Sequence, residues 1–256
     1  MRERAWLGTS ALLFAVSAAV TVIWCGSMSA MPGMEMPGGW TMSMAWMRMP
    51  DQSWPGAAAT FLGMWTVMMI AMMLPSLVPM LAGYRQALNG APHQDRLTVI
   101  AGTAYFLVWT LAGAIAYPLG IGLADLTMQE PALARAVPLA TGLIVIAAGA
   151  TQFTAWKARQ LARCREAPAC CRTQPPAAGS AWQHGFALGV RCVRCCVGPT
   201  AILLVCGVMD LRAMAVVTAA ISAERLLPAG ARVARATGAL VVGTGLFLIA
   251  TGIATG

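Results

Sequence analysis

Long runs of apolar residues alternate with short polar segments along most of the chain. Crossing a bilayer as an α-helix takes about 20 consecutive, mainly apolar residues. The fifth and sixth candidate runs are the weakest, because Arg191 and Arg194 flank or enter one and Glu224 lies within the other. The pattern nevertheless predicts a bundle of about seven transmembrane helices at 6–24, 61–82, 98–123, 137–155, 192–209, 211–227 and 238–254.

The composition indicates the same class of protein. Of the 256 residues, 59% are hydrophobic and 10% are charged, whereas soluble domains carry about 25% charged residues. The first apolar run follows Arg2 and Arg4 but is longer than the roughly 7–15 residues of a signal-peptide core. We therefore interpret it as an anchor, and we predict an all-α integral membrane protein with a single transmembrane domain over residues 1–256.

The basic residues predict an orientation. Lysine and arginine accumulate in the cytoplasmic segments of membrane proteins. With seven spans and a cytoplasmic N-terminus, 12 of the 17 basic residues lie on the cytoplasmic side, and only Arg48, Arg135 and Arg212 lie outside. We predict a multi-pass protein of the cell inner membrane in which residues 26–59 form a periplasmic or external loop and residues 156–184 a cytoplasmic loop. The net charge of +8 is then a topology signal, and no basic patch interleaved with aromatic residues indicates nucleic-acid binding.

Methionine is concentrated in one part of the chain: 14 of the 18 lie between Met28 and Met80. Thioether sulfur is a soft, neutral ligand that selects Cu(I), or its mimic Ag(I), over Zn, Mg or Ca. The external segment is broken by glycines and prolines, and its Met-x-Met and Met-x-x-Met spacings bring two or three sulfurs to one ion. The alternative is that these methionines fill gaps or form a docking surface for a partner. The candidate ligands in this segment are Met28, Met31, Met34, Met36, Met42, Met44, Met47 and Met49.

The second span carries its methionines on one side. At about 100° per residue, they form two rows within one half of the circumference: Met64, Met68 and Met72, and Met69, Met73 and Met80. We expect this half to face the bundle and to line a metal path, and the aliphatic half to face lipid. Packing alone would also place methionine in an interior. Pro75 and Pro79 predict a kink in the inner half of the helix.

Three cysteines lie together where the fifth span is predicted to leave the cytoplasmic side. Cys192, Cys195 and Cys196 are spaced i, i+3 and i+4, so they share one helical face. Thiols in this arrangement can bind a soft metal ion or act in redox chemistry, and Arg191 and Arg194 beside them would favour thiolate over thiol. The alternative is that they are small hydrophobic residues packed in the interior.

The remaining cysteines divide between the two sides of the predicted membrane. Cys164, Cys170 and Cys171 lie in the cytoplasmic loop, where a reducing compartment favours free thiols or metal ligands over disulfides. Cys25 stands alone at the outer end of the first span. A disulfide partner for Cys25 would have to lie at the same depth in the membrane. Cys206, on the same face of its helix as Cys192, is the only cysteine near that depth.

Histidine and acidic residues are scarce. The chain has only His93 and His184, which argues against a His-rich Zn or Cu(II) centre. We expect His184 to be either a ligand on a flexed segment or a capping or surface residue. For Glu224, within a predicted span, we expect Arg191 or Arg194 as the partner. No phosphate loop, catalytic triad or pair of catalytic carboxylates is present, so no catalytic residue and no nucleotide or organic cofactor is predicted.

The motifs resemble a bacterial family of uncharacterised proteins labelled predicted metal-binding integral membrane proteins. The resemblance covers most of the chain from about Gly38 to Gly256, and its most specific parts are MWTVMMIAMMLPS at 64–76 and CVRCC at 192–196. It implies a membrane metal-binding protein without naming a reaction. In the family pattern a small residue lies between the first two cysteines, where this chain has Arg194.

These patterns lead to one main hypothesis and two alternatives. In the main hypothesis the protein handles Cu(I): external methionines capture the ion, the second span relays it, and the inner cysteines receive it for transfer or transport. A copper chaperone or a client metalloprotein would be its partner beside the lipid bilayer. The alternatives are a metal- or thiol-dependent membrane oxidoreductase or metal-insertion factor, and a structural subunit whose methionine loop docks a partner.

Overall fold

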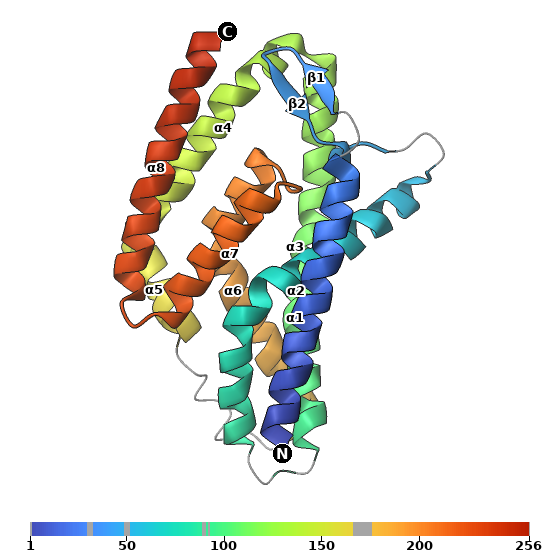
Figure 1. Ribbon diagram of the computed structural model, residues 1–256, viewed down its shortest axis with the longest axis vertical. Coiled ribbons are helices and arrows are strands. Elements are labelled where there is room, and N and C mark those ends of the chain that lie inside the picture. The colour runs from blue at the N-terminus through green and yellow to red at the C-terminus, as the bar shows by residue number, and fades with distance from the viewer. Residues whose placement is uncertain are drawn as a thin grey trace.

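The computed structural model describes residues 2–29, 33–48, 52–88, 91, 93–165 and 176–255. Within these ranges the chain forms eight α-helices, a short β-hairpin and one turn of 3-10 helix, η1. The helices are α1 (Arg2–Ser29), α2 (Trp54–Ala87), α3 (Gln94–Gln129), α4 (Pro131–Thr151), α5 (Ala155–Arg165), α6 (Ala178–Cys206), α7 (Leu211–Leu226) and α8 (Gly230–Thr255). Figure 1 shows α1, α2, α3 and α6 gathered in one bundle, with α4 and α8 side by side along its flank.

Six of the helices are long and apolar enough to cross a membrane: α1, α2, α3, α4, α6 and α8. The predicted sixth span corresponds to α7, which has 16 residues and is therefore about 24 Å long, short of the roughly 30 Å hydrocarbon core. The structure thus gives six span-length helices where the hydropathy pattern predicts seven. The N- and C-termini lie at opposite ends of the long axis, and α7 runs back between α6 and α8 (Figure 1).

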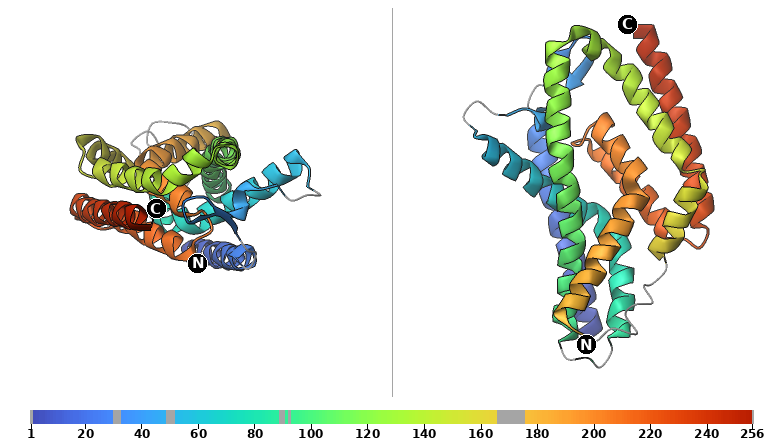
Figure 2. Two further views of the ribbon diagram at one scale, coloured as in Figure 1. Left: turned by 90° about the horizontal axis from the view of Figure 1, so that it is seen from above. Right: turned by 180° about the vertical axis from the view of Figure 1, so that it is seen from behind.

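Helix α2 changes direction along its length, and its N-terminal part projects away from the other helices (Figure 2). It packs against α1, α3 and α7, and Pro75 and Pro79 lie inside it. The expectation that its aliphatic half faces lipid is wrong for several residues, because Leu74, Leu77 and Leu81 are buried. A helix with neighbours on three sides has little surface left for lipid.

Glycines allow two helix pairs to approach closely. In α6, Gly185 and Gly189 face α3: a Cβ on Gly185 would overlap the backbone of Ala101, and one on Gly189 would lie 2.8 Å from the Cβ of Val108. In α4, a Cβ on Gly149 would lie 3.0 Å from the carbonyl oxygen of Gly238 in α8. Small residues at such contacts let backbones pack tightly in membrane bundles. The first contact fixes α6, which carries the cysteines, against α3.

The methionine-rich segment is more ordered than expected of an irregular loop. Helix α1 continues to Ser29, and strands β1 (Met34–Met36) and β2 (Trp40–Met42) pair antiparallel with Met36 opposite Trp40. Positive φ angles at Gly38 and Gly39 allow the tight turn between them. The Trp40 indole Nε1 donates to the Ala134 carbonyl oxygen at 2.8 Å, a carbonyl that loses its helical partner because Pro138 has no N–H. This bond holds the hairpin against α4.

The described parts of the segment predicted as a cytoplasmic loop, 156–184, are mainly helical. Helix α5 occupies Ala155–Arg165 and α6 begins at Ala178. Cys170 and Cys171 lie outside the described residues. Helix α5 packs against α6 and α7, which brings Lys157 and Cys164 to the cysteines of α6.

Candidate metal centre

The three clustered cysteines occupy the middle of α6, not its end. Cys192 follows Ala178 by 14 residues and precedes Cys206 by 14. The expected shared face is confirmed, since Cys192, Cys195 and Cys196 are all at most 2% exposed. The end of the span was misplaced because the helix extends 14 residues before the first cysteine, through a segment that is less apolar than the rest.

A cluster of sulfur atoms lies between α6 and α2. The Sγ atom of Cys192 is 3.9 Å from the Sγ atom of Cys196 and 3.9 Å from the Sδ atom of Met73. With a metal–sulfur bond of about 2.3 Å, sulfur ligands lie about 3.8 Å apart around a tetrahedral ion and about 4.0 Å apart around a trigonal one. Both separations therefore lie in the range expected for two sulfur ligands of one metal ion. We refer to Met73, Cys192 and Cys196 as the inner sulfur cluster.

Oxygen- and nitrogen-rich metal sites are absent from the described part of the chain. No group of three or more His, Cys, Asp or Glu side chains there is arranged to hold a metal ion. A site at the inner sulfur cluster thus depends on the thioether of Met73 as the third ligand, which favours a soft ion.

Two side chains from other helices donate hydrogen bonds to the cluster. The Tyr105 hydroxyl of α3 donates to the Cys192 Sγ atom at 3.0 Å, and the Arg225 Nη1 atom of α7 donates to the same sulfur at 3.1 Å. Arg225 also donates from Nη1 to the Ser76 hydroxyl at 2.9 Å, and its Nη2 atom lies 2.9 Å from the Met80 sulfur. These contacts favour a thiolate at Cys192, because hydrogen bonds and a positive charge stabilise the charged form.

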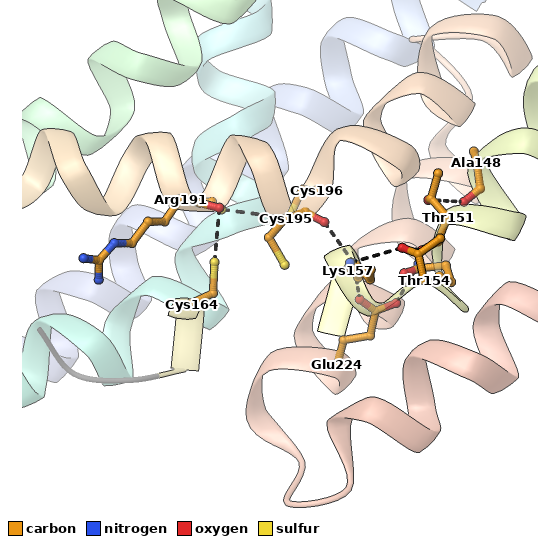
Figure 3. Close-up of polar contacts among 11 residues, drawn as sticks. Ala148, Thr151, Thr154, Lys157, Cys164, Arg191, Cys195, Cys196 and Glu224 are labelled. Atoms are coloured by element: carbon orange, nitrogen blue, oxygen red, sulfur yellow. Dashed lines mark hydrogen bonds and ion pairs between the residues drawn. The ribbon is translucent and has the colours of Figure 1, made fainter. Parts of the chain in front are cut away.

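Arg225 takes the place beside the thiols that the sequence suggested for Arg191 and Arg194. Arg194 is exposed, and the Arg191 guanidinium extends away from the thiols (Figure 3). Arg225 is only 7% exposed. Sequence reasoning missed it because it is 29 residues from Cys196, although its position at the inner end of an apolar segment marked it as unusual.

Glu224 is paired with Lys157, so the expected partners Arg191 and Arg194 are wrong. The Lys157 Nζ atom lies 2.8 Å from the Glu224 Oε2 atom, and the Gln152 Nε2 atom donates to Oε1 at 2.9 Å. Both charged side chains are at most 3% exposed. The reason is the position of α5, whose Lys157 enters the bundle next to α7 (Figure 3).

Lys157 also connects this ion pair to the cysteine segment. Its Nζ atom donates to the Cys195 carbonyl oxygen at 2.9 Å. In a regular helix the N–H of residue 199 would bond that carbonyl, but Pro199 has none. Burial would lower the pKa of Lys157, yet the negative charges of Cys195 and Glu224 outweigh it and raise the pKa. The ammonium group therefore remains charged beside the cysteines.

Cys164 is a fourth thiol near the cluster and comes from α5. Its Sγ atom donates to the Arg191 carbonyl oxygen at 3.2 Å (Figure 3). A hydrogen bond with Cys195, followed by burial, raises the pKa of Cys164. This thiol therefore stays protonated and acts as a donor, while Cys192 accepts.

The methionines of α2 connect the cluster to the far end of that helix. The expected interior face is confirmed: Met64, Met68, Met69, Met72 and Met73 are each at most 6% exposed. From Met64 to Met73 is nine residues, or about 14 Å along the helix. Successive methionines of this set are at most four residues apart, and we refer to the set as the methionine row.

The methionines of the predicted external segment lie in different surroundings. Met28 and Met47 line a pocket together with Met64, whereas Met36 and Met42 are buried under the hairpin against Ala124 and Ala134. Met34 is 40% exposed. Met44 belongs to η1 (Met44–Trp46), but its side chain is not described, and Met31 and Met49 lie outside the described residues.

Three other residues singled out in the sequence have different surroundings from those expected. Cys206 is exposed, and no disulfide joins the described cysteines; the Cys25 sulfur instead lies 3.8 Å from the Met209 sulfur. His184 is buried and stacks on Tyr84, with ring centroids 4.5 Å apart, about two turns from Cys192. It is therefore neither a surface residue nor part of the cluster.

The chain was compared with known protein families, curated proteins and solved structures. The model of the family described as PpoB2 copper chaperone matches residues 62–248, which include α2 and the cysteines of α6. The match covers most of the chain, so the protein belongs to this family. No curated protein matches, and no solved structure matches.

Proposed function

We propose that this member of the copper chaperone family binds Cu(I) within its membrane bundle at Met73, Cys192 and Cys196 and passes the ion to an acceptor. The observation that carries the proposal is the pair of 3.9 Å sulfur–sulfur separations at Cys192. Two thiols and one thioether form a soft donor set that matches Cu(I) better than Zn²⁺ or Mg²⁺. Tyr105 and Arg225 hold Cys192 in position by donating to its sulfur.

The charges near the cluster also favour a monovalent ion. The Arg225 guanidinium donates to the Cys192 sulfur, so its charge repels a divalent ion more strongly than a monovalent one. Lys157 and Glu224 neutralise each other. Arg225 is therefore the charged group that favours Cu(I) over a divalent ion.

The methionine row of α2 provides a route to the cluster. Thioethers bind Cu(I) without losing a proton, and thiolates bind it more strongly because they carry a charge. An ion entering near Met64 would pass Met68, Met69 and Met72 before reaching Met73 and the thiols. The acceptor is a copper chaperone or a client metalloprotein, and the family description supports such a partner.

Binding and transfer can be tested separately. Purified protein is titrated anaerobically with Cu(I) against a chromogenic chelator, and the Cys192→Ser/Cys196→Ser variant should lose the tight site. Cys206→Ser is the matched control, because Cys206 is exposed. In sealed proteoliposomes with a Cu(I) chelator inside, the wild type should deliver Cu(I) and the double variant should not. Thiol exchange without metal movement in the wild type would indicate an oxidoreductase instead, and tight binding by the double variant would refute the proposed site.

A further inference from the structure

A second group of sulfur atoms surrounds a pocket at the far end of the methionine row. The pocket has a volume of about 160 Å³ and lies between the C-terminal end of α1, η1, the first half of α2 and the turn after α6. Its lining includes Met28, Met47, Met64 and Met209. Four thioethers from four separate segments thus converge on one space.

Cys25 adds a buried thiol to this group. It lies one turn before Met28 on the same side of α1, is 1% exposed, and its sulfur is 3.8 Å from that of Met209. This separation again matches the spacing of two sulfur ligands on one ion with metal–sulfur bonds of about 2.3 Å. We refer to Cys25, Met28, Met47, Met64 and Met209 as the outer sulfur pocket.

The size and polarity of the pocket limit what it can hold. Sites for organic ligands usually have about 300–1,000 Å³, so the space is small for such a molecule. None of the residues that line the pocket is charged. The lining side chains that carry a hydroxyl or amide group are Gln52, Thr60 and Tyr117. A site without carboxylates or histidine does not attract Mg²⁺, Ca²⁺ or Zn²⁺. Flexible methionine side chains can close around a soft monovalent ion.

We infer that the outer sulfur pocket is a second Cu(I) site, which loads the inner sulfur cluster through the buried methionines of α2. Met64 belongs to both the pocket and the row, and Met73 of the inner cluster lies about 14 Å further along the same helix. Uncharged thioethers hold the ion less strongly than the inner thiolates, which directs it inward. This inference rests on the proposed function, since it assigns the place where the ion enters.

The test counts bound Ag(I) on the full-length protein in detergent, with Zn²⁺ as a competitor. The wild type should bind two equivalents that Zn²⁺ does not displace. Met28→Leu/Met47→Leu/Met209→Leu keeps nearly the same side-chain volume and should lose one equivalent while the inner site stays loaded. The matched control Met34→Leu/Met36→Leu/Met42→Leu, in the hairpin, should retain both.

The inner variant separates this inference from the proposed function. Cys192→Ser/Cys196→Ser should also bind one equivalent, held at the outer pocket and lost when the three leucine substitutions of the pocket are added. Two equivalents in the Met28/Met47/Met209 variant would overturn the outer pocket and leave the inner site standing. Two equivalents in the cysteine variant would instead overturn the inner site.

Discussion

The Arg225 Nη1 atom donates to the Cys192 Sγ atom across 3.1 Å, so a buried cation from α7 holds the central thiol of α6. The two residues are 33 positions apart in the chain. No carboxylate lies within ion-pair distance of Arg225 among the described residues, where the ion pairs are Arg85–Asp95 and Lys157–Glu224. The guanidinium charge therefore faces sulfur, and under the proposed function it favours a monovalent ion over a divalent one.

Removing that charge should weaken the preference for monovalent ions. We take a distance of about 5 Å between the guanidinium and the bound ion and an effective dielectric constant of about 20. The repulsion by Arg225 then raises the free energy of a bound divalent ion by about 3 kcal/mol more than that of a monovalent ion. Arg225→Gln should therefore lower the Ag(I)-over-Zn(II) preference by about two orders of magnitude. Arg225→Lys should retain most of it. Competition titrations measure the preference, with Arg85→Gln as a control at another buried arginine; an unchanged preference in Arg225→Gln would show that charge balance does not select the ion.

The buried pair of Lys157 and Glu224 should matter more for folding than for metal choice. Lys157→Met leaves Glu224 buried without its cation, and such a loss costs about 3–5 kcal/mol. Lys157→Met/Glu224→Gln removes both charges and should recover most of this stability. Asp95→Asn, which breaks the pair with Arg85 at its exposed end, should cost about 0–1 kcal/mol. Unfolding of the detergent-solubilised protein measures each value, and equal losses in the single and double variants would argue against a buried ion pair.

The thioether of Met73 should be needed for affinity but not for folding. Met73→Leu conserves volume and should cost less than about 1.5 kcal/mol in stability. Its Ag(I) affinity should fall by at least about tenfold, since even a lost outer-shell partner reduces metal affinity by about 10–100-fold. Met128→Leu, at a methionine that is 43% exposed on α3, serves as the control. Equal affinities in the wild type and Met73→Leu would leave the two thiols as the whole site.

The proposed orientation can be tested with Cys206, the exposed one among the cysteines that the structure describes. Cys206 lies at the end of α6 that we predict to be on the external side of the membrane, so an impermeant thiol reagent should label it in intact spheroplasts. Gln86 is exposed at the end of α2 that we place in the cytoplasm. Gln86→Cys in a Cys206→Ser background should be labelled only after permeabilisation. The reverse labelling pattern would show that the protein has the opposite orientation in the membrane.

The sequence predicted features that depend on local periodicity. Apolar run length located six span-length helices, and the 100° repeat placed the methionines of α2 in the interior, because both follow from the geometry of one helix. The partners of the thiols could not be found this way. Arg225 and Lys157 reach the cysteines through contacts between helices that are distant in the chain, and the predicted topology counts both among the cytoplasmic basic residues. Pro199 was the available signal for Lys157, since it frees the Cys195 carbonyl.

The span count shows the same limit. Leu211–Leu226 reads as a span because it is apolar, yet its 16 residues are too few for an ordinary crossing. Asp210 caps this helix by accepting from the backbone N–H groups of Arg212 and Ala213. Asp210 therefore has a structural role at the start of α7.

X-ray absorption at the copper edge tests the central claim most directly. For protein loaded with one equivalent of Cu(I), the account predicts a shell of three sulfur atoms at about 2.3 Å and no nitrogen or oxygen ligand. In Met73→Leu the shell should fall to two sulfurs, and in Cys192→Ser/Cys196→Ser the inner thiolate signal should be lost. A wild-type shell of nitrogen or oxygen ligands, or a sulfur shell unchanged by both substitutions, would contradict copper binding at Met73, Cys192 and Cys196.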